Sequence, residues 1–215
     1  MSKLSSLYEI RPVQEDEIGA VCREVFEVFT PASYTLAQLN LTRQEVEDWM
    51  HYELDTEWKR SHCLILIHKP TAVICGVAWA KPYSLMSQSL PAELGRIAPR
   101  HYCFQQIRID TTKKLGLNPN EVVYGEVACV NPLHRGSRLA LFSTIKVFEQ
   151  YAQLGYTSFM GETVNSHMIE NLSSWGIRIV GELNTSEFVL NGTKPFAKDL
   201  RMNIVYGPLS LKPKL

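Results

Sequence analysis

A single acidic side chain stands in an apolar stretch of this sequence. Residues 122–130 are nearly all apolar or small, which is typical of a buried central strand, and Glu126 is their only acid. Burial of a lone carboxylate is costly and raises its pKa, which suits a general base that works near neutral pH. Glu126 is therefore the candidate catalytic residue. The alternative is a carboxylate that faces solvent at the mouth of the sheet.

The alternation of side chains along a strand predicts the neighbours of Glu126. Successive residues point to opposite faces, so Glu126 is expected to share a face with Tyr124, Ala128 and Val130. Cys129 falls on the other face. The sequence offers it no evident partner histidine, so a packed thiol is favoured over a nucleophile.

A short turn follows this strand and leads into a helix predicted at 138–154. The turn holds Arg135, Gly136 and Ser137. The first amides of a helix have no partner within it, and the helix dipole adds partial positive charge there. Such a turn can bind a diphosphate without a basic side chain. The alternative is an ordinary connection between a strand and a helix.

The turn resembles the acetyl-CoA motif of the GNAT superfamily of N-acetyltransferases. That motif reads Q/R-x-x-G-x-G/A after a strand that ends near V-x-P-x-x-R-G. The residues that keep its spacing are Val130, Pro132, Arg135, Gly136, Leu139 and Ala140. Arg138 stands where the motif has its first glycine. Its amide is retained, and its side chain either crowds the pyrophosphate or adds a charge-assisted contact.

The resemblance implies a site for acetyl-CoA as co-substrate. The pyrophosphate would lie on the amides of the turn, and the pantetheine arm would pair with free backbone groups at the end of the strand. The residues assigned to this site are Cys129, Val130, Arg135, Gly136, Ser137, Arg138, Leu139, Ala140 and Asn165.

A second segment, 165–177, resembles a further motif of the superfamily through Asn165 and Gly176. The tyrosine that usually protonates the leaving thiolate in the family is replaced by Leu172, so the resemblance assigns no general acid. Polar side chains nearby are His167, Ser173 and Ser174. A solvated helix face accounts for them better than a catalytic role.

The periodicity of apolar residues predicts one mixed α/β domain over 1–215. The expected strands are 8–13, 62–68, 72–80, 122–130, 156–163, 177–183 and 202–206, and the expected helices are 15–29, 42–58, 100–115, 138–154 and 166–175. This order matches the superfamily, which implies a central sheet that splays after its fourth strand. Residues 81–120 are an expected insertion between the third and fourth strands, where Tyr83, Tyr102 and Phe104 either shape a substrate pocket or pack internally.

The composition excludes several classes of function. The 22 basic and 22 acidic side chains cancel, which argues against a nucleic-acid partner. No apolar run reaches the ~18 residues of a membrane span, and residues 1–6 carry no secretory signal. Five scattered cysteines without zinc-ligand spacing predict no metal site and reduced, mostly buried thiols in a cytoplasmic protein. The oligomeric state stays open.

The resemblance to the GNAT superfamily implies an N-acetyltransferase that transfers an acetyl group from acetyl-CoA directly to a small primary amine. The insertion before the fourth strand, residues 164–167 and the tail from Phe188 to Met202 also resemble, more weakly, the invertebrate arylalkylamine N-acetyltransferase branch. The acidic segment that carries the base in that branch corresponds to residues 31–34 here, which include no acid. One alternative is a GNAT-fold protein that binds acyl-CoA with weak or no transfer. Another is an acyltransferase for a larger acyl group.

Overall fold

The protein is built around one seven-stranded mixed sheet. We describe residues 6–87, 89–135 and 138–209 of a computed structural model. The strands are β1 (Tyr8–Pro12), β2 (Cys63–His68), β3 (Val73–Pro82), β4 (Val122–Val130), β5 (Ser158–Thr163), β6 (Arg178–Asn184) and β7 (Arg201–Pro208). Their order across the sheet is β1-β2-β3-β4-β5-β7-β6. The predicted α/β fold class is thereby confirmed.

The helices connect these strands and cover both faces of the sheet. The α-helices are α2 (Ile18–Glu24), α3 (Thr30–Ala32), α4 (Tyr34–Leu39), α5 (Arg43–Glu53), α6 (Glu57–Ser61), α7 (Ala98–Leu115), α8 (Leu139–Gln153) and α9 (Ser166–Ser173). A π-helical turn, η2 (Val25–Phe29), joins α2 to α3. The 3-10 turns are η1 (Glu15–Glu17), η3 (Tyr83–Ser87), η4 (Ala92–Leu94), η5 (Pro119–Glu121), η6 (Pro132–His134) and η7 (Thr185–Glu187).

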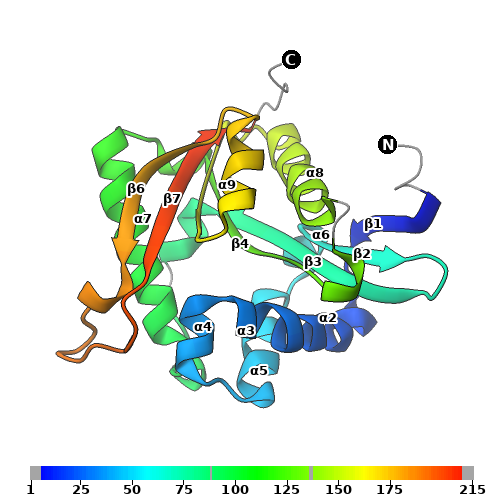
Figure 1. Cartoon of the computed structure of the whole chain (residues 1–215), viewed down its shortest axis with the longest axis horizontal. Helices are drawn as coiled ribbons and strands as arrows, with labels where there is room; N and C mark the ends of the chain where they lie inside the picture. Colours follow the sequence, from blue (N-terminus) through cyan, green and yellow to red (C-terminus); the bar gives the residue numbers. More distant parts are fainter. Residues whose placement is uncertain (1–5, 88, 136–137, 210–215) are drawn as a thin grey trace.

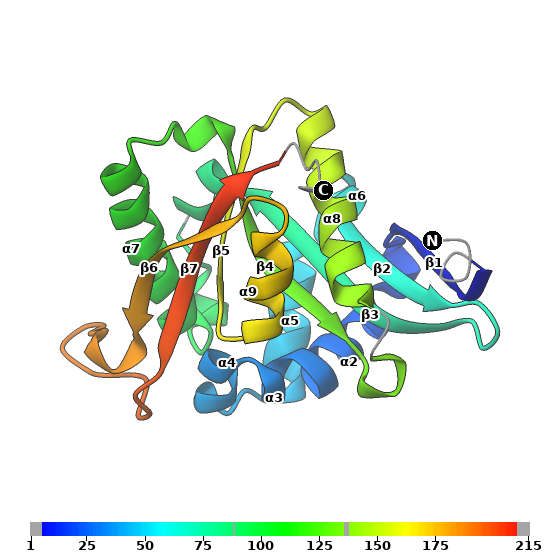
Figure 2. The ribbon, with the colours of Figure 1, turned by 45° about the horizontal axis from the view of Figure 1, so that its top comes forward.

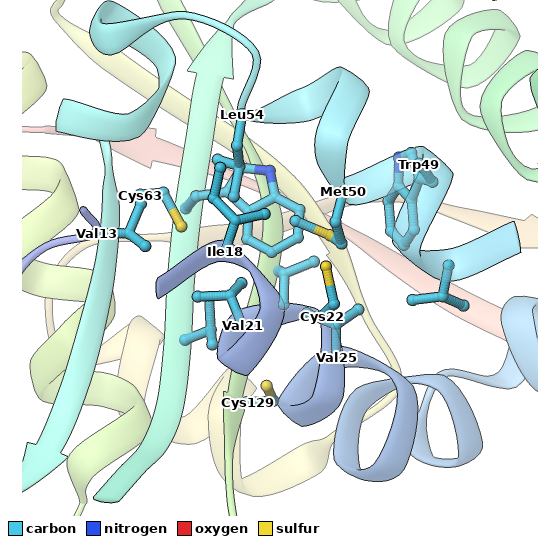
Figure 3. Close-up of a cluster of buried hydrophobic side chains, with 14 of the residues drawn as sticks. Val13, Ile18, Val21, Cys22, Val25, Trp49, Met50, Leu54, Cys63 and Cys129 are labelled. Carbon is cyan, nitrogen blue, oxygen red and sulfur yellow. The ribbon is translucent and has the colours of Figure 1, made fainter. Parts of the chain in front are cut away.

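Two helical layers sandwich the sheet (Figure 1). Helices α8 and α9 lie on one face, and α2, α3, α4 and α5 lie on the other. The core on the α2 side joins that helix and α5 to β2, β3 and β4, through residues such as Val21, Met50 and Cys129 (Figure 3). The core on the α8 side contains Leu64, Ala78 and Phe148. The alternation of Leu64 with Cys63 and Ile65 between these two cores is the strand periodicity expected from the sequence.

The sheet opens between β4 and β5. These strands pair in parallel at Val122–Ser158, Val123–Phe159 and Tyr124–Met160, and beyond those pairs they diverge (Figure 2). Each keeps its other neighbour: β4 pairs with β3 as far as Val130, and β5 pairs with β7 as far as Thr163. The facing edges of β4 and β5 therefore leave backbone groups open to a ligand, as the predicted splay requires.

A β-bulge in β4 changes the direction of Glu126. Trp79 of β3 pairs with Val127 and the next residue, Ala80, pairs with Gly125, so Glu126 is an extra residue in the ladder. A bulge re-aims the side chains around it. The prediction that Glu126 shares a face with Val130 is wrong. Val130 packs with Leu139 at the start of α8, whereas Glu126 faces α5 and α7.

Most predicted elements lie within a few residues of their expected positions, and two segments differ. The helix expected at 15–29 continues through Pro31 into α3. In the π-helical turn the Thr30 amide donates to the carbonyl of Val25, five residues back, and the next residue, Pro31, needs no amide hydrogen there. The expected helix at 42–58 keeps its Thr42–Glu45 capping box but ends at Glu53, and the separate helix α6 follows.

Candidate functional site

The opening between β4 and β5 is the floor of a cleft with a volume of about 780 Å³. Residues from α3, α4 and α7 line it on one side of the sheet, and residues from α8 and α9 line it on the other. The ring of Phe159 lies over the backbones of Gly125 and Gly161, where a Cβ atom would come within 2.7 and 2.9 Å of it. The two glycines thus let an aromatic ring lie across the floor where the strands part.

Six charged side chains meet beneath the cleft. This charged cluster consists of Glu53, Lys81, Arg100, Arg108, Glu126 and Glu162, three acids and three bases. The elements that supply them are α5, β3, α7, β4 and β5. A cavity of about 10 Å³, roughly the space of one water molecule, lies among five of the six side chains. Buried charges are stable only when paired in this way.

Glu126 is the centre of the charged cluster. Its carboxylate, 2% exposed, lies 3.2 Å from Arg100, 3.3 Å from Lys81 and 3.5 Å from Arg108. Arg100 also donates to the backbone carbonyl of Glu126 at 3.3 Å, which ties α7 to the bulge. Lys81 is shared with Glu53, whose oxygens lie 2.8 and 2.9 Å from its Nζ.

The ionisation of Glu126 differs from the expectation. Burial alone would raise its pKa, but Lys81, Arg100 and Arg108 together outweigh burial and hold the pKa of this carboxyl well below its usual range. Glu126 is therefore a charged carboxylate with little tendency to accept a proton. Its assignment as the base stays a prediction, without the raised pKa that suggested it.

Glu162 on β5 is a second buried carboxylate, and the sequence analysis missed it. It lines the cleft, its side chain is 4% exposed, and its nearest cation is the Arg108 Nε at 3.8 Å. Burial raises its pKa to about 7, against partial offsets from Arg108 and Arg100. The signal was similar to that used for Glu126, a lone acid in a segment expected to be a strand.

The residues assigned to acetyl-CoA come together at the other side of the cleft. Val130, Arg135, Leu139 and Ala140 line it there, and Cys129 lines it as well, although its side chain packs in the core on the α2 side. Cys129 and Val130 end the open edge of β4, while Leu139 and Ala140 form the first turn of α8. The Arg135 Nε donates to the carbonyl of Val130 at 3.4 Å.

Two of the residues assigned to acetyl-CoA, Gly136 and Ser137, lie outside the described residues. Their assignment stays a prediction.

Arg138 lines the cleft in a left-handed backbone conformation, with φ 55° and ψ 26° at the N-cap of α8. This region favours glycine and costs other residues roughly 1–2 kcal/mol. The glycine of the GNAT motif would adopt it freely.

The region of the missing general acid offers no strong substitute. Leu172 is buried and lines the cleft. The hydroxyls of Ser173 and Ser174 donate to carbonyls of their own helix, and His167 is exposed at 3.6 Å from Glu170. Asn165 lines the cleft, and its side chain also caps α9 by accepting from the Met168 amide at 3.1 Å.

The remaining expectations concern thiols, aromatic residues and metals. All five cysteines are free and buried, as predicted, and burial raises the pKa of Cys129 to about 12, which makes it a poor nucleophile. Tyr83, Tyr102 and Phe104 were expected either to shape a pocket or to pack internally; Phe104 lines the cleft, and Tyr83 packs in the core. Within residues 6–87, 89–135 and 138–209, no group of three His, Cys, Asp or Glu side chains is arranged to hold a metal ion, and no helix is long and apolar enough to cross a membrane.

Solved structures match the protein over almost its whole length. No protein-family model matches the sequence, and no curated protein matches it either. The mosquito arylalkylamine N-acetyltransferase like 5b has a TM-score of 0.75 at 13% identity, over 94% of this chain and 99% of that chain. The polyamine N-acetyltransferase of Drosophila melanogaster, which forms N-acetylagmatine, has a TM-score of 0.70 at 11% identity, over 94% and 99%.

A third structure of similar closeness is a condensation domain. The C-terminal condensation domain of Ebony, solved with beta-alanyl-dopamine, has a TM-score of 0.75 at 11% identity, over 94% of this chain and 98% of that chain. At such identities the likeness shows the fold. The protein has the GNAT fold of the N-acetyltransferases, with insect arylalkylamine N-acetyltransferase-like proteins among the structures that resemble it.

The charged cluster predicts a large effect of removing the Glu126 charge. Glu126→Gln leaves three buried cations short of one partner and is expected to lower the free energy of unfolding by about 3–5 kcal/mol. Denaturant titration at pH 7 measures it. The control is Glu149→Gln, a carboxylate that is 51% exposed and paired with Lys146, for which the loss should stay below about 1 kcal/mol. Equal losses would contradict the central role of Glu126.

The raised pKa of Glu162 predicts a pH dependence of stability. Between pH 4.5 and about 7 the unfolded chain loses this proton while the folded protein keeps it. The contribution of Glu162 to the free energy of unfolding is therefore fully present below pH 4.5 and is lost as pH rises to 7, by on the order of 3 kcal/mol. The lowered pKa of Glu126 makes a contribution of the opposite sign to the pH dependence of stability, but that contribution is lost only below pH 4.5. From pH 5 to 8 the free energy of unfolding should fall more in the parent than in Glu162→Gln. Parallel curves for the two proteins would show that Glu162 titrates normally.

Proposed function

We propose that the protein is an acyltransferase that moves the acetyl group of acetyl-CoA directly to a small primary amine. The observation that carries this proposal is the cleft through the splayed sheet. It has the open strand edge and the first turn of α8 on one side of the sheet and buried carboxylates on the other. A thioester and an amine can approach the same point from opposite faces of such a sheet.

The α8 side is suited to the coenzyme. Its pyrophosphate would lie at the first turn of α8, near Arg135 and Arg138, where unpaired amides and the helix dipole favour an anion. The pantetheine arm would add to the open edge of β4 beside Cys129 and Val130. A backbone amide at that edge would polarise the acetyl carbonyl, as in other acyl transfers. Asn165 lies at the far rim of the same cleft.

The opposite side is suited to an amine with an apolar arm. Phe29, Tyr34, Phe104 and Met202 line it, and Glu162 supplies a carboxylate at its deep end. An ammonium group would pair with the carboxylate while its carbon chain or ring contacts the apolar wall. Arylalkylamines, the acceptors in the names of some of the structurally similar proteins, combine a primary amine with such an arm, and agmatine, named in another, carries its amine on a carbon chain that ends in a guanidinium group.

In one alternative the protein binds the coenzyme but transfers its acyl group weakly or not at all. Leu172 at the position of the usual acid and Arg138 in place of a glycine both favour a protein that binds acyl-CoA without efficient transfer. The other alternative is an acyltransferase whose donor is an acyl-CoA with a larger acyl group.

A donor and acceptor panel tests the proposed function. Free thiol is measured after mixing the protein with acetyl-CoA, butyryl-CoA or decanoyl-CoA and with phenethylamine, butylamine or agmatine, and the acetylated amine is identified by mass. The expected result is amine-dependent release from acetyl-CoA. Thermal shift with acetyl-CoA but no release with any amine would support the binding protein, and preference for a longer acyl-CoA would support the second alternative.

The left-handed Arg138 predicts opposite effects on stability and coenzyme affinity. Arg138→Gly relieves the backbone and is expected to raise the free energy of unfolding by up to about 1 kcal/mol. It also removes a cation beside the phosphates, so the affinity for acetyl-CoA should fall about tenfold. Calorimetric titration with acetyl-CoA measures the affinity, and denaturant titration measures the free energy of unfolding. In the control Asn191→Gly, at another left-handed residue, affinity should not change. An unchanged affinity in Arg138→Gly would show that the guanidinium does not contact the coenzyme.

A further inference from the structure

Two carboxylates flank the opening in the sheet, one on each diverging strand. Glu126 lies on β4 and Glu162 on β5, both on the face covered by α7, and Arg108 reaches both. Their electrostatic surroundings differ. Three cations lie within 3.5 Å of Glu126, while the nearest cation to Glu162 is 3.8 Å away. Among the described residues, the Oε1 atoms of both carboxylates are buried without a hydrogen-bond partner, but that of Glu126 has the Lys81 Nζ at 3.3 Å, and that of Glu162 has only the Arg108 Nε at 3.8 Å.

A buried carboxylate oxygen without a donor is unfavourable unless a ligand satisfies it. Leaving such an atom unpaired costs about 1–3 kcal/mol or more. Glu162 follows Gly161, which lies on the cleft floor, and precedes Thr163 and Val164, which line the cleft as well. The ammonium or the neutral amine of an acceptor is a donor that can reach this oxygen from the cleft.

On the basis of the proposed acetyl transfer, we infer that Glu162 is the general base that takes the proton from the acceptor amine. Glu126 then serves as the anion that neutralises Lys81, Arg100 and Arg108. This assignment gives the proton transfer to Glu162 and the neutralisation of the buried cations to Glu126.

The proton and electron balance of the step is simple. The Glu162 carboxylate accepts one proton from the ammonium nitrogen, and the freed lone pair forms the N–C bond with the acetyl carbonyl. The C–S bond then breaks and its electron pair leaves on the thiolate of CoA. The amide nitrogen sheds its second proton, and the thiolate takes up one proton. The net products are the amide, CoA as its thiol and one proton released to solvent.

The groups that face Glu162 support this role. Arg100, Arg108 and Cys103 face it from α7, and Glu126 faces the same arginines from β4. The arginines are partly neutralised by Glu126, so burial dominates and the pKa of Glu162 is about 7. A general base is most effective when its pKa lies near the working pH.

The test compares Glu162→Gln with the parent over a range of pH. With acetyl-CoA and phenethylamine, kcat/KM of the parent should rise with an inflection near pH 7. Glu162→Gln should lower kcat/KM about 10² to 10⁴-fold at pH 7 and remove the inflection, with an unchanged Kd for acetyl-CoA. Gln mimics the protonated acid, so this variant is expected to fold. Glu149→Gln, far out on the exposed face of α8, should retain the parent profile.

The outcomes separate this inference from the proposed function. If the parent shows no turnover with any amine of the panel, the proposed function and this inference both fail. If the parent is active and Glu162→Gln keeps its kcat and its inflection, only the inference fails. An increase in KM at unchanged kcat and inflection would overturn it too, because Glu162 would then only bind the amine. Loss of the inflection in folded Glu126→Gln but not in Glu162→Gln would return the role to Glu126.

Discussion

The neutralisation of Glu126 is the constraint on which the rest of the structure depends. A carboxylate buried at a bulge in the central strand cannot remain charged without partners, and this one is paired with a lysine from β3 and two arginines from α7. Helix α7 belongs to the segment that the sequence suggested as an insertion over one edge of the sheet. In the structure α7 places the buried guanidiniums of Arg100 and Arg108 beside Glu126 on the central strand β4.

The arginines themselves are held by aromatic rings. The Arg108 guanidinium lies 3.2 Å from the centroid of the Tyr124 ring, and that of Arg100 lies 4.7 Å from the Phe104 ring and 5.3 Å from the Trp49 ring. A guanidinium keeps its charge when buried and stacks on ring faces, which a lysine does less well. The charged cluster therefore fixes the distance between α7, α5 and the sheet, and so the shape of the α7 side of the cleft.

The sequence predicted the fold well because the signals were local. Strand and helix periodicity, the Thr42–Glu45 capping box and the turn before α8 each depend on neighbouring residues. The side-chain direction of Glu126 was predicted wrongly because a bulge arises from pairing with β3, which one strand's sequence does not reveal. Likewise, Arg100 and Arg108 are charged residues on a helix, where an exposed position is the ordinary expectation, and only tertiary contacts identify them as buried.

The charged cluster also explains how two identical side chains acquire different chemistry. Both Glu126 and Glu162 are almost fully buried, so desolvation opposes the charge on each. The nearness of the cations decides the result. Three cations within 3.5 Å lower the pKa of Glu126, whereas Arg108 and Arg100 only partly offset the burial of Glu162 and leave its pKa near 7. Pairs of acids whose surroundings push their pKa values apart commonly divide structural and proton-transfer roles. Because Arg108 touches both, a change at Glu126 must also change the proton affinity of Glu162, so neither acid acts independently of the other.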